Sequence, residues 1–111
     1  MTSAQKAYIE LYRSIIDHVE GIELKGKTMP YTSVNGRMFS QLNKDGEIGI
    51  RLSEVEMQKF FSKFPDSKPF KSYGATLKGY VLIPEEMLAD PALIGEYLAM
   101  SYQHVLTLEP K

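Results

Sequence analysis

Two dipeptides, Asn35-Gly36 and Asp45-Gly46, limit the possible folds of this chain more than any other feature. A tight type I′ hairpin turn needs positive φ at both central residues, which Asn or Asp followed by Gly adopts at little cost. Apolar and polar residues alternate around these turns, as Ile48, Ile50 and Leu52 show. The pattern predicts an antiparallel meander with one buried face, in strands over about Met29–Val34, Arg37–Leu42 and Ile48–Leu52.

Helical patterns stand before and after this meander. From Thr2 to about Glu20, apolar residues recur every three or four positions, and Thr2 with Gln5 fits a capping box. Ser53 with Glu56 fits a second capping box. It opens a helix whose aromatic stripe runs to about Phe64.

The last part of the chain predicts two strands and a helix. The strands span about Phe70–Ile83, where either Gly74 or the Lys78-Gly79 pair can make the turn or a bulge. Asp90-Pro91 starts the helix, with a capping carboxylate and a proline at the first helical position. The resulting order, α-β(3)-α-β(2)-α, predicts one α+β domain over residues 1–111. It is a two-layer α/β sandwich with a five-stranded antiparallel sheet and helices on one face. Because the other face is left uncovered, we expect a homodimer.

Composition excludes several classes of chemistry. The chain has no cysteine, so disulfides, thiolate catalysis and zinc–thiolate sites are ruled out. Thirteen basic and 14 acidic residues give a net charge of −1, which makes strong nucleic-acid binding possible but not favoured. No signal-peptide pattern or long apolar run is present, so we expect a cytoplasmic protein without a membrane partner.

Residues 21–28 match the phosphate-loop pattern G-x-x-x-x-G-K-[ST], with Lys27 and Thr28 in the last two positions. A working phosphate loop must follow a buried strand and open a helix whose amides face the phosphates. Here a predicted helix precedes Gly21, and Pro30 with a predicted strand follows. We therefore interpret the match as accidental and predict no nucleotide or other cofactor.

The other candidate chemistry is also better explained by structure. His18 and His104 lack metal-ligand spacing, and the four serines Ser33, Ser40, Ser72 and Ser101 lack a nucleophile elbow. The acidic cluster Glu85, Glu86 and Asp90 is interpreted as favourable charge at the start of the last helix. The sequence therefore predicts neither a catalytic residue nor a metal site.

One surface remains as a candidate for binding. Basic residues interleaved with tyrosines can hold phosphates and stack bases, although an ordinary solvated sheet shows the same residues. The candidates are Lys25, Lys27, Tyr31, Asn35 and Arg37, with Arg51, Tyr73, Lys78 and Tyr80 as sheet neighbours.

From about Gly26 to Tyr102 the chain resembles the TfoX N-terminal domain family, which is related in fold to YjbR-like and secretion-chaperone-like proteins. The resemblance is carried by Gly36-Arg37-Met38-Phe39, Asp45-Gly46, Ile50-Arg51-Leu52, residues 80–86 and Asp90. It implies the same α-β(3)-α-β(2)-α fold in a bacterial, cytosolic and often dimeric protein. The family has no established catalytic residues, so none is transferred.

Three functions follow as hypotheses. The first is a non-enzymatic regulatory or protein-binding domain. The second is a nucleic-acid-binding protein or a component of a competence-type transcriptional regulator. The third is a small-molecule-binding domain or an enzyme of unknown class.

Overall fold

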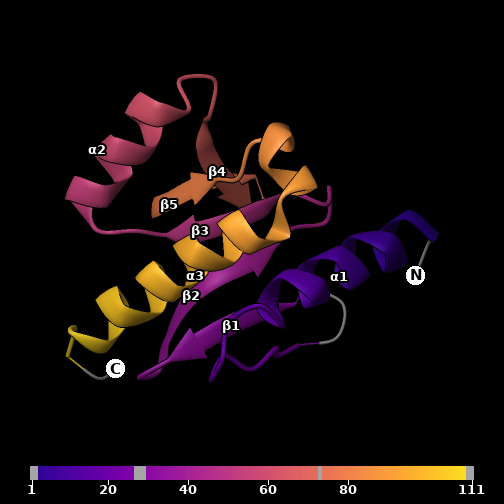
Figure 1. Ribbon diagram of the computed structural model, residues 1–111, viewed down its shortest axis with the longest axis horizontal. Coiled ribbons are helices and arrows are strands. Elements are labelled where there is room, and N and C mark those ends of the chain that lie inside the picture. Colours follow the sequence, from indigo (N-terminus) through magenta and orange to yellow (C-terminus); the bar gives the residue numbers. More distant parts are fainter. Residues whose placement is uncertain (1–2, 27–29, 73, 110–111) are drawn as a thin grey trace.

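The structure is a computed structural model that describes residues 3–26, 30–72 and 74–109. It confirms the α+β fold, with helices over one face of a five-stranded antiparallel sheet in the order β1-β2-β3-β5-β4 (Figure 1). The elements are α1 (Ser3–Ile16), β1 (Tyr31–Val34), β2 (Arg37–Leu42), β3 (Ile48–Arg51), α2 (Glu54–Lys63), β4 (Pro69–Ser72), β5 (Ala75–Leu82), a 3₁₀ helix η1 (Glu85–Ala89) and α3 (Pro91–Leu106).

Both turn dipeptides form the predicted hairpins. Asn35 and Gly36 have φ values of 62° and 75° between β1 and β2, and Gly46 has a φ of 81° between β2 and β3. The proposed start of the first strand at Met29 lies outside the described residues. The described strand begins at Tyr31, directly after Pro30.

A bulge at Phe39 adds one buried ring to the core. Thr32 pairs with Ser40, whereas the next residue, Ser33, pairs with Met38, so Phe39 is the extra residue on β2. A bulge of this kind turns two successive side chains toward the same face. The Phe39 ring accordingly meets Tyr102 of α3, at 5.8 Å between centroids. Ser40 Oγ meets the Tyr12 hydroxyl of α1 at 2.5 Å.

The main core lies between this sheet face and the helices. All three α-helices, η1 and strands β2, β3 and β5 contribute fully or almost fully buried side chains. They are Tyr12, Ile15, Ile16, Phe39, Leu42, Ile48, Ile50, Leu52, Phe60, Val81, Ile83, Met87, Ile94, Leu98 and Val105.

The helix starts follow the predicted signals where they are described. The Ser53 hydroxyl accepts from the Glu56 amide, at 3.3 Å, and Asp90 Oδ1 accepts from the Leu93 amide, also at 3.3 Å. The first capping box depends on Thr2, which lies outside the described residues. Helix α1 ends at Ile16, before the predicted Glu20, because its last turn tightens into i→i+3 hydrogen bonds.

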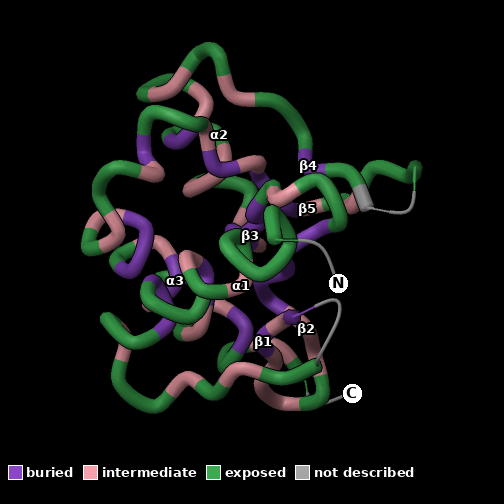
Figure 2. The backbone as a smooth tube through the Cα atoms, turned by 90° about the vertical axis from the view of Figure 1, so that its right-hand side faces the viewer, coloured by how far each residue is buried: buried purple, intermediate pink, exposed green. Residues whose placement is uncertain are grey.

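The β4–β5 hairpin covers part of the second sheet face. Gly74 makes the turn, with a φ of 76°, and Gly79 produces an irregularity inside β5, with a φ of 87°. Figure 2 shows this hairpin on the side of the sheet away from the helices. The ring of Phe70 there occupies the space that a Cβ on Gly49 of β3 needs. Phe70 is fully buried, so the fold itself covers part of the face that the sequence left open.

Candidate functional site

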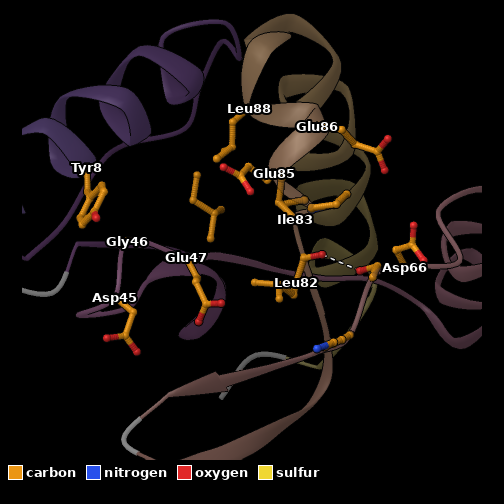
Figure 3. Close-up of a pocket in the computed structure, with 14 residues that line it drawn as sticks. Tyr8, Asp45, Gly46, Glu47, Asp66, Leu82, Ile83, Glu85, Glu86 and Leu88 are labelled. Atoms are coloured by element: carbon orange, nitrogen blue, oxygen red, sulfur yellow. Dashed lines mark hydrogen bonds between the residues drawn. The ribbon is translucent and has the colours of Figure 1, made fainter.

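A groove of about 630 Å³ lies where β3 begins and β5 ends (Figure 3). Four segments that are distant in sequence line it: α1, the β2–β3 turn, the α2–β4 loop, and the end of β5 with η1. Four other hollows of the surface enclose between about 10 and 390 Å³. We call this hollow the acid-rimmed groove, and its lining residues are Tyr8, Asp45, Gly46, Glu47, Ile48, Asp66, Ser67, Lys68, Leu82, Ile83, Pro84, Glu85, Glu86 and Leu88.

The floor of the groove is apolar and continuous with the core. Ile48 and Ile83 are 1% and 5% exposed, and a hydrogen bond of 2.9 Å from the Ile83 amide to the Ile48 carbonyl joins their strands. Leu82 and Leu88 are half-buried at the sides. Such a surface can bind hydrocarbon groups of a ligand.

The rim is acidic. Asp45, Glu47, Asp66, Glu85 and Glu86 supply five carboxylates, whereas Lys68 supplies the groove's single ammonium group. In the part of the chain that the structure describes, the one ion pair within 4 Å joins Lys59 to Glu56 on α2. No rim carboxylate therefore forms an ion pair with a lysine or arginine of the described chain.

Asn43 holds the β2–β3 turn that forms one side of the groove. Its Oδ1 accepts from the amides of Asp45 and Glu47, at 3.0 and 2.9 Å. Its Nδ2 donates to Glu47 Oε1 at 3.0 Å and to the Lys71 carbonyl of β4 at 2.9 Å. Asn43 is only 7% exposed, so one buried amide connects the turn to the hairpin on the second sheet face.

Tyr8 completes this side by packing on the turn. Figure 3 shows its ring lying over Gly46. A Cβ at Gly46 would stand 2.6 Å from the Tyr8 ring, and the positive φ there also disfavours any other residue. The glycine is thus needed both for the turn and for the approach of α1.

The opposite end of the groove is also held by hydrogen bonds. The Ser67 hydroxyl donates to the Leu82 carbonyl at 2.6 Å. The Leu82 amide donates to the Lys68 carbonyl at 3.1 Å. These bonds fix the α2–β4 loop beside β5, so the groove has two fixed ends.

The acidic cluster at residues 85–90 divides into two parts. Asp90 caps α3, as predicted. The prediction is wrong for Glu85 and Glu86, because the first turn of α3 contains no acidic residue. These two residues begin η1 instead and line the groove.

The predicted basic and tyrosine surface is only partly brought together. Arg51 and Tyr80 pair across β3 and β5, and Lys78 lies two residues along β5 from Tyr80. Tyr80 is 7% exposed, and its hydroxyl donates to the Met38 carbonyl at 2.7 Å. Burial raises the pKa of Tyr80 to about 12, against the opposite effect of the Arg51 charge.

The other members of that surface contact the chain itself. Lys25 forms a bridge with Tyr31 at the edge of β1, and its Nζ donates to Ser33 Oγ at 2.9 Å. Asn35 Nδ2 donates to the Leu108 carbonyl at 3.0 Å, and Arg37 Nε to the Glu109 carbonyl at 2.9 Å. Lys27 and Tyr73 lie outside the described residues.

The phosphate-loop match has the wrong surroundings for a nucleotide. It follows α1, and Pro30 leads into β1, so among the described residues the next helix begins at Glu54. Lys25 inside the match is paired with Tyr31 in extended backbone. Lys27 and Thr28 themselves lie outside the described residues.

The histidines and buried serines do not form a catalytic arrangement. Gly95 of α3 lies against His18, and His104 is nine residues further along that helix, roughly 13 Å at the usual helical rise. Ser40 and Ser101 are fully buried, and Ser101 donates to the Phe39 carbonyl. Among the described residues, no three His, Asp or Glu side chains are grouped so as to hold a metal ion.

The fold and groove together define a small two-layer α+β domain with an apolar, acid-rimmed groove on its surface. No family model matches the chain, and neither a curated protein nor a solved structure is similar to it. The resemblance to the TfoX N-terminal domain family therefore stays a prediction. Within the described ranges, no helix has both the length and the apolar character needed to cross a membrane.

Proposed function

We propose that this chain is a non-enzymatic protein-binding domain whose acid-rimmed groove receives a segment of the partner. The observation that carries the proposal is the groove's apolar floor, held between two hydrogen-bonded ends. A preformed surface loses little conformational entropy on binding, which favours recognition of an extended segment. The bacterial, cytosolic setting that we propose for it rests on the resemblance to the TfoX N-terminal domain family.

Peptide display with the whole domain as bait tests the proposal. We expect selected peptides to shift the backbone NMR signals of Gly46, Ile48 and Leu82, which line the groove. Leu88→Ala should weaken binding by about fivefold, because it removes apolar contact area. Leu106→Ala on α3 is the control, since Leu106 is 42% exposed and does not line the groove.

Two results would count against this function. Selected peptides that shift signals only outside the groove would place binding elsewhere. Equal weakening by Leu88→Ala and Leu106→Ala would show that the apolar side of the groove makes no specific contact.

The nucleic-acid alternative has less support. It needs Lys25, Lys27, Arg37, Arg51 and Lys78 on one face, and two of these already donate within the chain. We expect no binding of double-stranded DNA at low salt. A steep dependence of affinity on salt concentration would favour this alternative over the groove.

A further inference from the structure

The acid-rimmed groove differs in charge from the chain as a whole. The chain carries 13 basic and 14 acidic side chains, whereas the groove lining carries five carboxylates and one ammonium group. An anionic ligand in this groove would be repelled, and a neutral one would leave the local charge uncompensated. We infer that the partner segment is positively charged, with lysine or arginine on both sides of an apolar centre. This inference rests on the proposed function of the groove.

The positions of the carboxylates support an occupant with cations at both ends. Figure 3 shows Asp45 and Glu47 on one side of the groove and Asp66 and Glu86 on the other. Glu85 turns its carboxylate inward, near Leu88. The apolar floor lies between the two acidic sides, so the charged groups of the partner flank its apolar group.

The same spacing favours several separate cationic groups over one metal ion. No three acidic or histidine side chains of the described residues are grouped to hold a metal. Lysine and arginine suit this arrangement, because their methylene stems cover apolar surface while their charges stay at the wet rim. Tyr8 adds an aromatic ring at the rim, where a cation can also be held.

Replacing Lys68 gives a test in which the groove becomes more negative instead of less negative. It is the one cation in the groove lining, and its side chain is exposed. Its backbone carbonyl, rather than its ammonium group, holds the loop to Leu82. Removing the Lys68 charge should therefore strengthen binding of a cationic segment without loosening the loop.

Three synthetic peptides with the same leucine-rich centre and with lysine, glutamine or glutamate flanks test the inference on the intact domain. We expect the lysine peptide to bind at least about tenfold more tightly than the glutamine peptide and the glutamate peptide not to bind. Raising the salt concentration should weaken the lysine peptide severalfold.

Matched variants assign this preference to the rim. The double variant Asp66→Asn/Glu86→Gln should weaken the lysine peptide by about five- to tenfold, and Lys68→Gln should tighten it by about two- to threefold. The control Asp17→Asn/Glu23→Gln removes the same two charges from exposed residues outside the groove and should change affinity by less than about twofold.

The outcomes separate the inference from the proposed function. If the glutamine peptide shifts the groove signals and binds as tightly as the lysine peptide, the charge preference is overturned and the protein-binding function stands. If the rim variant and its control behave alike, the inference is also overturned. If spermine alone binds as tightly as the lysine peptide, the occupant is a small cation. If no peptide shifts the groove signals, the proposed function fails as well.

Discussion

At the residue scale, the amide side chain of Asn43 connects the β2–β3 turn to β4. Asn43 makes four hydrogen bonds, with Asp45, Glu47 and Lys71 as partners. Because Asn43 is almost fully buried, water cannot take over these hydrogen bonds in the folded domain. Losing one of them would leave a buried polar group without a partner. Both the shape of the groove and the position of β4 depend on it.

Asn43→Asp should lower the free energy of unfolding by about 2–3 kcal/mol, because it removes both donors and places a second carboxylate beside Glu47. Chemical denaturation at neutral pH measures the change. Lys44→Ala, in the same turn but exposed, is the control and should stay within about 0.5 kcal/mol of the wild type. An Asn43→Asp variant with the wild-type denaturation midpoint would show that these donors do not stabilise the fold.

A second residue-scale prediction concerns Tyr80 at alkaline pH. Its folded pKa of about 12 exceeds the ordinary tyrosine value of about 10, since burial disfavours the phenolate. The neutral phenol therefore stabilises the fold fully below pH 10, and this contribution is lost as the pH rises through 12.

The variant Tyr80→Phe tests this pH dependence. At pH 7 it should be less stable than the wild type by about 1 kcal/mol, because the hydrogen bond to the Met38 carbonyl is lost. Above pH 10 the difference in stability between the wild type and the variant should become smaller, because only the wild type has this phenol and loses stability as it ionises. Chemical denaturation of both proteins from pH 8 to 11 measures this difference in stability. A difference that stays constant or grows would contradict the raised pKa of Tyr80.

At the scale of elements, the β4–β5 hairpin depends on a contact between one glycine and one ring. Gly49→Ala places a methyl group where the Phe70 ring lies. It should cost about 1–3 kcal/mol, since backbone and ring must both shift. Phe70→Leu alone should also destabilise the domain, but combining it with Gly49→Ala should cost less than the sum. Thermal or chemical unfolding of the wild type, the two single variants and the double variant gives the coupling free energy. Strictly additive costs would mean that the Phe70 ring does not oppose the methyl group.

Local signals predicted most elements, and the helix that was missed lacks such a signal. Asp45-Gly46, Ser53 and Asp90-Pro91 act within a few residues, so the sequence shows the hairpin and the two helix starts. The helix η1 was missed because a short 3₁₀ turn has no apolar stripe of its own.

The candidate site was missed for a different reason. Glu47 and Glu85 are far apart in the sequence, and the pairing of β3 with β5 brings their segments to one end of the sheet. No local pattern specifies that pairing. One signal was present, since most rim carboxylates stand within a few residues of a predicted strand end. The segments that follow or precede neighbouring antiparallel strands come close together where those strands end at the same end of the sheet.

At the scale of the whole molecule, the second sheet face offers less surface for the predicted homodimer than the sequence suggested. The rings of Phe70 and Tyr80 on the second sheet face are already buried within one chain. The helix layer exposes apolar side chains instead, at Val55, Met100 and Leu106, which are 62%, 37% and 42% exposed.

We predict a dimer with twice the 12.6 kDa mass of one chain. Light scattering at micromolar concentrations measures it. Val55→Glu or Leu106→Glu should shift the population toward monomer if the helix layer is the interface. A single-chain mass across the concentration range would show the prediction to be wrong.

At both edge strands of the sheet, some backbone groups are already paired within the chain. Beyond β1, the backbone of Lys25 exchanges both of its hydrogen bonds with Tyr31, and at β4 the Lys71 carbonyl is taken by Asn43. Exposed strand borders with free amides and carbonyls invite other chains to stack onto them. Because some backbone groups at both edge strands are already paired within the chain, fewer of them are left for an added strand, which disfavours stacking into fibres.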